Sequence, residues 1–408
     1  MSELEKRIKQ LCPNGVPRLK VRDIATEMFR GAGIKREDLT DEGVPCIRYG
    51  EIYTTYGVYF DKCFSHVLPA KVPSKKTLKK NDLLFAITGE SIADIGKCTA
   101  YIGEEEGLVG GDILVVRHTQ NPKYLSYALS TSDAIRQKGR GMVKSKVVHA
   151  SAGSIGAIEI PVPPLEVQGE IVRILDDFTE LTAELTAELT ARKKQYEFYR
   201  DRLFADIDRK YLKPLGSFAS IKRGGNFQKK DFADDGRPCI HYGQIYTHFG
   251  VHSDRALKFL NDDVFNASKK AQKSDIVMAV TSENVEDVCK CVAWLGDEEI
   301  AVSGHTAIIS HNVNAKYLSY FFHSSSFFVQ KVKLAHGTKV IEVTPDRLLN
   351  IMVPVPPLAE QERIACVLDS FDSLINGLAD GIPGEIEHRQ KQYEFYRDKL
   401  LSFGEAAR

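Results

Sequence analysis

The sequence predicts an α+β protein made of two homologous domains separated by a pair of long helices. We expect these helices to pack as an antiparallel coiled coil, with a pseudo-two-fold relation that comes from internal duplication. The first observation is that residues 45–54 (PCIRYGEIYT) return as residues 238–247 (PCIHYGQIYT), 193 positions later. The second is that a strongly helix-forming segment follows each copy. A repeat this long indicates a domain duplication rather than a solenoid.

Composition limits the class of protein. The chain has 408 residues, of which 43% are hydrophobic and 27% charged, as is usual for two or three soluble globular domains. No apolar run reaches the ~20 residues that cross a bilayer, and the N-terminal sequence is not a signal peptide, so we expect a cytoplasmic protein. The eight cysteines lack a Cys-x-x-Cys pair and are expected to be reduced thiols. The formal net charge is zero, so nucleic-acid binding has to be argued from local patches.

The first domain is predicted to span residues 1–160. It opens with a short amphipathic helix over residues 3–11, which ends at Pro13-Asn14-Gly15. Runs of β-branched and aromatic residues at 82–87 and 111–116 predict strands, and residues 123–138 predict a helix. The second domain, residues 208–353, repeats this order, with the matching helix expected at 316–331.

Residues 161–207 predict one long helix after the first domain. Inside it the unit Thr-Ala-Glu-Leu occurs twice in tandem, at Thr182–Leu189, and Leu181, Leu185 and Leu189 recur every four residues. Each unit advances a helix by about 6 Å and overshoots one turn by about 40°. A repeat of this kind is poorly suited to keeping its leucines on one packing seam. It is well suited to setting the distance and the rotation between the two ends of the helix. We therefore interpret the tract as a spacer.

Residues 354–408 predict the second helical segment, which is broken near 381–384 where Gly-Ile-Pro-Gly takes the place of the spacer tandem. Apolar residues at helical spacing predict the packing seam between the two helices. The seam residues are Ile171, Leu175, Phe178, Leu185, Tyr196, Tyr199 and Leu203 on the first helix and Ile364, Leu368, Phe371, Leu374, Tyr393, Tyr396 and Leu400 on the second. Core packing is the expected role of the aromatic residues.

Two homologous domains held at a fixed separation suit an extended partner that carries two sites. Double-stranded DNA read as two half-sites is such a partner, because the spacing of the half-sites then follows from protein geometry. One Thr-Ala-Glu-Leu unit would move the domains by about 6 Å, which is between one and two base-pair rises of ~3.4 Å.

The Pro-Pro-Leu-x-x-Gln opening of each helix, the spacer tandem, the Lys-Gln-Tyr-Glu-Phe-Tyr-Arg-Asp helix ends and the duplication resemble the specificity (S) subunit of type I restriction–modification enzymes. The resemblance covers essentially the whole chain. It implies two target recognition domains, each reading one half of a bipartite asymmetric DNA sequence, and helices that fix the gap. It also implies that this chain does no chemistry and binds no cofactor. Two modification subunits with S-adenosylmethionine would methylate adenine, and restriction subunits would use ATP and Mg²⁺ to translocate and cut DNA.

The motifs agree with a non-catalytic role. The sequence has no Asn-Pro-Pro-Tyr or Asp-Pro-Pro-Tyr motif for methylating a base amino group. The segment Gly89–Cys98 resembles a phosphate loop only weakly, because six residues separate its glycines and Cys98 replaces the Ser or Thr that would bind Mg²⁺.

Basic clusters occur at matching places in the two domains and predict phosphate contacts, although solvated loops are an alternative. The first cluster comprises Lys71, Lys75, Lys76, Lys79 and Lys80 in one domain and Lys269, Lys270 and Lys273 in the other. The second contains glycines that would let a loop close on DNA. It comprises Arg136, Lys138, Arg140, Lys144 and Lys146 in one domain and Lys331, Lys333, His336 and Lys339 in the other.

Base contacts are predicted from two features. Arg30 and Arg223 begin glycine turns and would read guanine or phosphate, although a simple tight turn explains them equally well. Tyr53 and Tyr246 would reach base edges from neighbouring strands. The strongest candidates for readout are positions that differ within a shared frame, namely Arg48/His241, Glu51/Gln244, Thr55/His248 and Ser91/Asn284.

Two other functions stay open. A scaffold that binds proteins through its helices explains the neutral charge, but it leaves the matching basic clusters unexplained. An enzyme acting alone is a further alternative that lacks a recognisable cofactor loop, metal cluster or catalytic triad.

Overall fold

The computed structural model describes residues 3–72, 76–91, 94–140, 148–377 and 381–403. The chain forms two compact units. Unit 1 comprises Met1–Leu185 with Ile386–Arg408, and unit 2 comprises Thr186–Glu385. The long helix α7 (Leu165–Ala205) therefore contributes to both units, as does α14 (Ile382–Leu400). The division of α7 falls inside the Thr-Ala-Glu-Leu tandem.

Unit 1 contains two five-stranded sheets, in the orders β2-β12-β8-β10-β5 and β3-β6-β4-β11-β7. Pairing is antiparallel except for β10 with β5 and β11 with β4. Two small sheets, β1-β14 and β13-β9, complete the unit. The strands are β1 (Arg18–Lys20), β2 (Ala25–Arg30), β3 (Leu39–Thr40), β4 (Val44–Ile47), β5 (Tyr59–Phe60), β6 (Ser65–Val67), β7 (Thr77–Leu78), β8 (Leu83–Ala86), β9 (Thr88–Gly89), β10 (Cys98–Tyr101), β11 (Gly107–Val109), β12 (Ile113–His118), β13 (Val148–His149) and β14 (Glu159–Pro161).

Unit 2 repeats this topology strand for strand, with sheets β16-β26-β22-β24-β19 and β17-β20-β18-β25-β21 and the small sheets β15-β28 and β23-β27. The strands are β15 (Leu212–Pro214), β16 (Ala219–Arg223), β17 (Phe232–Ala233), β18 (Arg237–Ile240), β19 (His252–Ser253), β20 (Lys258–Leu260), β21 (Lys270–Ala271), β22 (Ile276–Ala279), β23 (Thr281–Ser282), β24 (Cys291–Trp294), β25 (Ile300–Val302), β26 (Thr306–His311), β27 (Ile341–Glu342) and β28 (Met352–Pro354). The predicted α+β duplication is confirmed.

The central strand β8 contributes to two of the hydrophobic cores of unit 1. Its four residues are all buried, and successive side chains of a strand point to opposite faces. Leu83 and Phe85 join the core on the helix side, whereas Leu84 and Ala86 join the core on the other side. A strand buried on both faces has no polar positions, which explains the continuous apolar run in the sequence.

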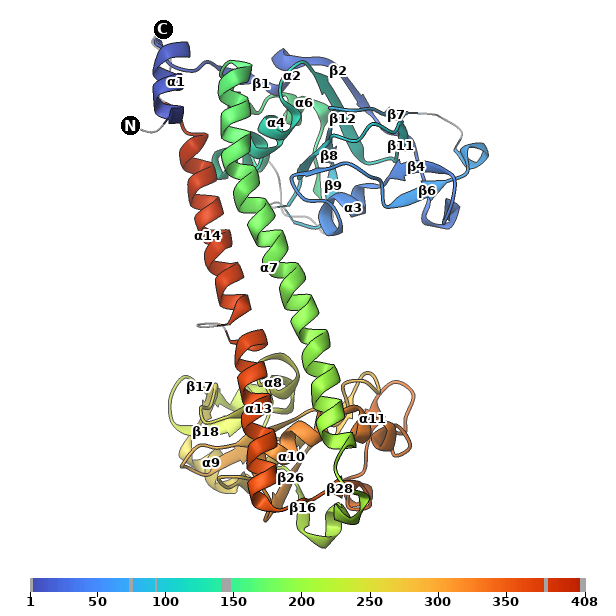
Figure 1. The fold of residues 1–408 in the computed structure, drawn as a ribbon, viewed down its shortest axis with the longest axis vertical. Coiled ribbons are helices and arrows are strands. Elements are labelled where there is room, and N and C mark those ends of the chain that lie inside the picture. The colour runs from blue at the N-terminus through green and yellow to red at the C-terminus, as the bar shows by residue number, and fades with distance from the viewer. Residues whose placement is uncertain (1–2, 73–75, 92–93, 141–147, 378–380, 404–408) are drawn as a thin grey trace. The chain divides into compact units, whose positions relative to one another are not determined.

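Helices cover one face of this sheet in each unit. In unit 1, α4 packs against β10 on one side and bonds α7 on the other. Figure 1 shows α4 beside α7. The helices other than α7 and α14 are α1 (Glu3–Leu11), α2 (Val21–Ile24), α3 (Tyr49–Thr54), α4 (Pro122–Leu129), α5 (Ser132–Lys138), α6 (Ala152–Gly156), α8 (Tyr242–Thr247), α9 (Asp262–Ala267), α10 (Ala315–Phe322), α11 (Ser325–Val332), α12 (Pro345–Leu348) and α13 (Leu358–Asn376).

The single helix predicted at 123–138 is wrong, because two helices occupy this range. Thr131 interrupts the run, and its hydroxyl accepts a hydrogen bond from the Ala134 N–H, which caps α5. Ser324 does the same for α11 in unit 2, where its hydroxyl accepts from the Phe327 N–H. Side chains that bond their own backbone at a helix start favour a cap over helix continuation.

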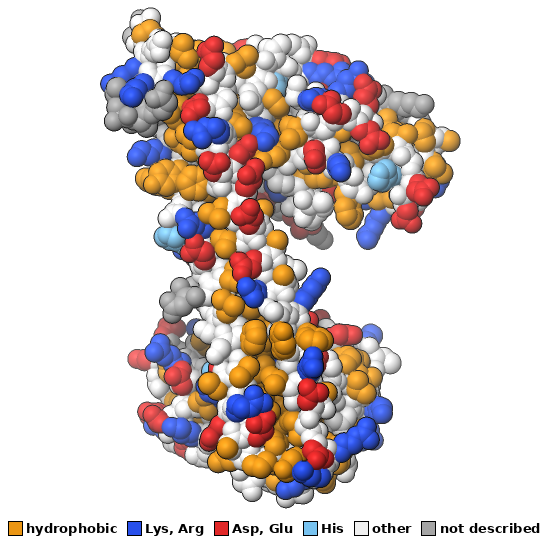
Figure 2. Space-filling model, in the orientation of Figure 1, with side chains coloured by type: hydrophobic (Ala, Val, Ile, Leu, Met, Phe, Trp, Pro, Cys, Tyr) orange, Lys and Arg blue, Asp and Glu red, His pale blue; other side chains and the backbone are white. Residues whose placement is uncertain are grey.

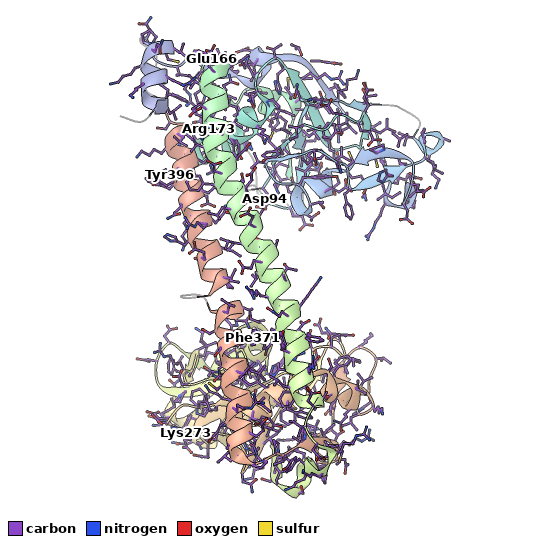
Figure 3. The ribbon with its side chains drawn as sticks, in the orientation of Figure 1. Asp94, Glu166, Arg173, Lys273, Phe371 and Tyr396 are labelled. Carbon is purple, nitrogen blue, oxygen red and sulfur yellow. The ribbon has the colours of Figure 1, made fainter. Side chains whose placement is uncertain are left out.

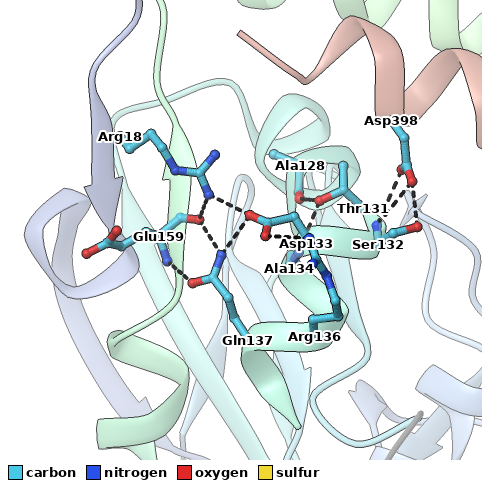
Figure 4. Close-up of polar contacts among 10 residues, drawn as sticks. All are labelled: Arg18, Ala128, Thr131, Ser132, Asp133, Ala134, Arg136, Gln137, Glu159 and Asp398. Atoms are coloured by element: carbon cyan, nitrogen blue, oxygen red, sulfur yellow. Dashed lines mark hydrogen bonds and ion pairs between the residues drawn. The ribbon is translucent and has the colours of Figure 1, made fainter. Parts of the chain in front are cut away.

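Each unit is closed by a helix end that comes from the other repeat. In unit 1, α14 lies antiparallel to α7, and Tyr396 stacks on Phe178 with ring centroids 5.4 Å apart. The Asp398 carboxylate at the end of α14 accepts hydrogen bonds from the backbone N–H and the hydroxyl of Ser132 at the start of α5 (Figure 4). In unit 2 the end of α7 has the same role, since Asp201 accepts from Ser325.

The predicted seam divides into two kinds of contact. Ile171, Leu175, Ile364 and Leu368 are fully buried, but they pack into the domain cores as well as along the helices. Tyr196 and Tyr199 meet Phe371 across the helix pair of unit 2, at centroid distances of 6.5 and 5.9 Å. By contrast, Leu374 is 38% exposed and is not a core residue.

The leucine side chains of the spacer tandem bury little of their surface. Leu181 is exposed, and Leu185 and Leu189 are half-buried. This agrees with a tract that sets length rather than one seam. The second helical segment is interrupted between the end of α13 and the start of α14, in the region of Gly377 and Gly381.

Two further properties concern the environment of the chain. All eight cysteines are free thiols. Among the described residues, no helix is both long enough and apolar enough to cross a membrane.

Candidate nucleic-acid interface

In unit 1 three segments meet at the end of β2. The Gly31 N–H donates to the Ile113 carbonyl at 2.9 Å, and the Gly110 N–H donates to the Ile47 carbonyl at 2.8 Å. A Cβ on Gly31 would lie 2.0 Å from the Gly110 carbonyl oxygen, so only glycine fits there. We call this place the three-segment junction. Its segments are residues 30–33, 47–49 and 110–112.

Unit 2 contains the same junction. The Gly224 N–H donates to the Thr306 carbonyl at 3.0 Å, and the Ser303 N–H donates to the Ile240 carbonyl at 3.0 Å. A Cβ on Gly224 would lie 2.0 Å from the Ser303 carbonyl oxygen. The segments here are residues 223–226, 240–242 and 303–305. The two units therefore share one backbone frame and differ in the side chains that it carries.

Each junction presents an arginine that is held by a carboxylate. Arg30 pairs with Asp112, and Arg223 pairs with Glu342 at 2.8 Å. The side chains of the two arginines nevertheless remain 61% and 65% exposed. A guanidinium has five N–H donors, so an exposed one that is held by a carboxylate keeps donors for a further acceptor. Of the sequence-predicted base contacts, these two arginines fit the geometry best.

His241 has a different role from the predicted one. It is 6% exposed, and its Nδ1 accepts a hydrogen bond from the Gly243 N–H at 3.1 Å, at the start of α8. Burial lowers the pKa of His241, and electrostatic interaction with Lys229 and His305 lowers it further. A neutral, buried ring that caps a helix cannot read a base edge in this position. Its counterpart Arg48 is half-buried at the start of α3.

Tyr53 and Tyr246 also act as framework residues. The Tyr53 hydroxyl donates to the Thr88 carbonyl at 3.1 Å, and the Tyr246 hydroxyl donates to the Thr281 carbonyl at 2.6 Å. Burial raises the pKa of Tyr53 to about 12. Both hydroxyls are therefore used to hold α3 and α8 to neighbouring strands.

A cleft lies beside the junction of unit 1. Its volume is about 620 Å³, and Tyr49, Tyr53, Asp94 and Lys97 contribute to its lining. Asp94 is labelled in Figure 3. The Lys97 ammonium donates to the Tyr53 carbonyl at 3.3 Å, and burial lowers its pKa. The lysine of the weak phosphate-loop resemblance is therefore used within the protein.

The predicted phosphate contacts lie in several environments. Lys76 is exposed, with its ammonium 5.4 Å from the centroid of the Phe29 ring. Lys80 pairs with Glu104, and Lys273 (labelled in Figure 3) pairs with Asp297 at 2.6 Å. Lys269, Arg140 and Lys339 are exposed, whereas Lys144 and Lys146 lie outside the described residues. Figure 2 shows basic and acidic side chains interspersed on the visible faces of both units.

Two lysines of the second basic cluster are wrongly placed by the sequence interpretation. Lys138 and Lys331 are each 5% exposed. The Lys138 ammonium donates to the Leu129 carbonyl at 2.7 Å, and the Lys331 ammonium donates to the Val288 carbonyl at 2.6 Å. Burial lowers the pKa of Lys138 to about 8. Both side chains tie helix ends or turns together and do not face solvent.

The last predicted pair of readout residues lies on matching loops. Asn284 is exposed, but its amide already bonds the loop, since Oδ1 accepts from the Asp287 N–H at 2.7 Å. Ser91 is half-buried, and its carbonyl accepts from the Ile95 N–H at 3.1 Å. Both residues therefore shape their loops.

The sequence interpretation missed Asp112 and His305, which follow the same turn in the two junctions. The duplication offset aligns them, and their side chains differ within a shared frame, so the signal was present in the sequence. The chain therefore contains two copies of one domain, with the same backbone frame and different polar side chains at one surface junction.

The chain belongs to the type I restriction modification DNA specificity domain family, which matches residues 18–192 and 211–388. It is 35% identical over 291 residues to the type I restriction enzyme EcoR124I/EcoR124II specificity subunit of Escherichia coli, covering 69% of this chain and 70% of that protein. It is 24% identical over 362 residues to the MjaVIII specificity subunit of Methanocaldococcus jannaschii, covering 81% and 80%. A solved chain from a type I R-M system has the same fold, with a TM-score of 0.63 at 16% identity over 95% of this chain and 97% of that one. The resemblance seen in the sequence is confirmed.

The close approach at Gly224 predicts a stability effect. Gly224→Ala should lower the free energy of unfolding of unit 2 by about 1–3 kcal/mol, because the new methyl group overlaps the Ser303 carbonyl. Urea unfolding followed by the fluorescence of Trp294, the single tryptophan and a core residue of unit 2, measures this. Gly250→Ala is the control, since no atom lies within 4 Å of its Cβ position. Equal effects of the two substitutions would contradict the packing at the junction.

Proposed function

We propose that this chain is the DNA sequence-specificity subunit of a type I restriction–modification complex. Each recognition domain (residues 18–161 in unit 1 and 211–354 in unit 2) reads one half of a bipartite, asymmetric target. The helices that carry the spacer tandem set the gap between the two halves. The chain directs adenine methylation and restriction by partner subunits and does no chemistry itself.

The observation that carries this proposal is the duplicated three-segment junction. Both copies hold an exposed arginine on a carboxylate, yet Asp112 in one copy is replaced by His305 in the other. Arginine is the side chain that most often reads guanine in the major groove. A repeated frame with different polar groups is what two readers of different DNA words require. A protein-binding scaffold has no comparable need for it.

If this chain only recognises DNA, the cofactors of the complex bind to its partner subunits. S-adenosylmethionine belongs to the modification subunits, and ATP and Mg²⁺ belong to the restriction subunits. Because the net charge of this chain is zero, the modification subunits supply much of the phosphate contact. A subunit that reads DNA works where the DNA is, so we place the complex in the cytoplasm.

The surface for the modification subunits is supported by two exposed aromatic pairs. Phe198 and Tyr199 on α7 are 57% and 41% exposed, and Phe395 and Tyr396 on α14 are 61% and 42% exposed. Each pair is edge-to-face, with centroids 5.5 and 5.3 Å apart. Exposed aromatic clusters are typical of protein interfaces. One pair in each unit provides one equivalent site for each of two modification subunits.

Methylome sequencing tests the proposed function. Cells that express this chain with its modification subunit should show methylated adenine in a two-part motif with a fixed gap. Cells with the modification subunit alone are the control and should lack the motif. If the complex assembles and no new methylation appears, the proposal fails.

Deletion of Thr186–Leu189 tests the spacer. Removing four helical residues shortens α7 by about 6 Å, which corresponds to between one and two base-pair rises of ~3.4 Å. The methylated motif should keep both half-sequences and lose one or two base pairs from its gap. A deletion variant that methylates altered half-sequences would show that the tract does not act as a spacer.

The aromatic pairs are tested by subunit stoichiometry. Phe198→Ser should weaken the binding of one modification subunit by about 2 kcal/mol, roughly thirty-fold, because an exposed aromatic side chain at an interface centre is a frequent hot spot. Phe395→Ser should do the same, and the double variant should lose both subunits in native mass spectrometry. Glu197→Gln, at an exposed neighbouring position, is the control. Full occupancy of both sites in the double variant would exclude this surface.

A further inference from the structure

The turn that precedes β12 and its copy before β26 has an unusual backbone. Asp112 has φ of 59° and His305 has φ of 62°, the left-handed region that glycine adopts most easily. This region is unfavourable for a residue with a Cβ. The residue directly before each of them is a glycine (Gly111 and Gly304), but the position with positive φ is not a glycine in either repeat. Both repeats nevertheless retain a polar side chain at this point.

The side chains differ in chemistry although the backbone is the same. Asp112 accepts a hydrogen bond from Arg30. His305 is exposed, and its ring centroid lies 5.3 Å from that of Tyr242. Asp112 therefore offers an acceptor beside a guanidinium donor, whereas His305 offers an imidazole that can both donate and accept. A strained residue at a surface site is a reason to look for function.

The neighbouring candidates are already used within the protein. His241 caps α8, and the hydroxyls of Tyr53 and Tyr246 are bonded to strand carbonyls. Asp112 and His305 occupy the equivalent junction position at which the two repeats carry different polar side chains. Neither side chain is used as a helix cap or to bond a strand carbonyl in the contacts described above.

We propose that Asp112 and His305 are specificity-determining residues, and that each reads one base pair of the half-target assigned to its own unit. This inference rests on the proposed function. A carboxylate accepts from the amino group of cytosine, and an arginine donates to the O6 and N7 atoms of guanine. The Asp112–Arg30 pair thus fits a C·G base pair. The imidazole of His305 fits a base that presents an acceptor in the major groove, such as guanine.

The test uses the full chain assembled with its modification subunits and a panel of duplexes. The panel varies each base pair of the methylated motif in turn, and the methylation rate is measured on each duplex. Asp112→Gly removes the side chain and keeps a residue that prefers this backbone, so the turn should fold. Discrimination at one base pair of one half-sequence should fall by on the order of ten- to one-hundred-fold, with the other half-sequence unaffected. His305→Gly should do the same in the other half.

The matched controls are Asn81→Ser and Ser274→Asn. These residues also have positive φ, at equivalent turns of the two repeats, and they are outside the junction segments. Both variants should keep the motif and its discrimination. Asp112→Asn adds a directional test, because an asparagine amide pairs with adenine and should shift the preferred base at that position towards A·T.

The outcomes separate this inference from the function on which it rests. If the wild-type complex methylates a bipartite motif and both glycine variants retain full discrimination, the inference is overturned and the proposed function stands. A uniform loss of rate on every duplex, without relaxed discrimination at one base pair, would also overturn it, since that result marks a structural role. If the wild-type complex methylates no bipartite motif, the proposed function itself fails.

Discussion

One carboxylate on each long helix anchors a recognition domain to the scaffold. In unit 1, Asp176 on α7 accepts from the Lys123 ammonium at 2.7 Å and from the Tyr127 hydroxyl at 2.8 Å. Both donors come from α4, the helix that packs against strand β10 of the sheet. In unit 2, Asp369 on α13 accepts from the equivalent lysine and tyrosine at 2.7 and 2.8 Å. The carboxylates are partly exposed, 16% for Asp176 and 29% for Asp369, so losing a donor would leave a charge that is less well solvated than in the unfolded chain.

The electrostatics of this anchor stabilise the attachment. Burial alone would raise the pKa of Asp369, but hydrogen bonds from His252, Lys316 and Tyr320 outweigh it and lower the pKa to about 2. An unfolded aspartate has a pKa of about 3.9, so the folded value is the lower one. The stabilisation is therefore complete above pH ~4 and is lost only as the pH falls towards 2. Near neutral pH the recognition domain is held at a fixed point on its helix.

The same anchor in both repeats makes the two units equivalent as scaffolds. Each is completed by a helix end from the other repeat, through Asp398 in unit 1 and Asp201 in unit 2. The three-segment junction is built where strands of the domain end, whereas the anchor groups lie on helices. Under the proposed function, the residues that read DNA and the residues that attach the domain therefore belong to different elements.

Sequence patterns predicted the features that depend on periodicity and repetition. The duplication, the buried strand β8 and the long helices follow from repeated blocks and from runs of apolar residues. The features that were missed depend on where individual side chains point in the folded chain, even when their partners are close in sequence. Lys138 lies in the last turn of a helix, where a lysine usually faces solvent, and only the folded chain brings its ammonium to the Leu129 carbonyl. His241 stands in a varying position, yet its ring is used as a helix cap.

The turn of Asp112 and His305 shows why the site was harder to predict than the fold. Its left-handed backbone arises where three segments cross, and Gly31 must be a glycine because a distant carbonyl lies against it. A single sequence gives the identities of these residues, but it does not show that the three segments lie next to one another in the fold. Aligning the two repeats does show that Asp112 in one corresponds to His305 in the other. The structure adds the reason to single out this pair, because it lies at the surface of the three-segment junction.

The most direct test of the account is to replace residues 18–161 by a second copy of residues 211–354 and sequence the methylome. If each recognition domain reads its half-sequence independently of the domain in the other unit, the methylated motif should contain, in both halves, the half-sequence that unit 2 reads in the wild-type complex, with an unchanged gap. A motif that keeps the word of the removed domain, or one with an unrelated word, would contradict this independence.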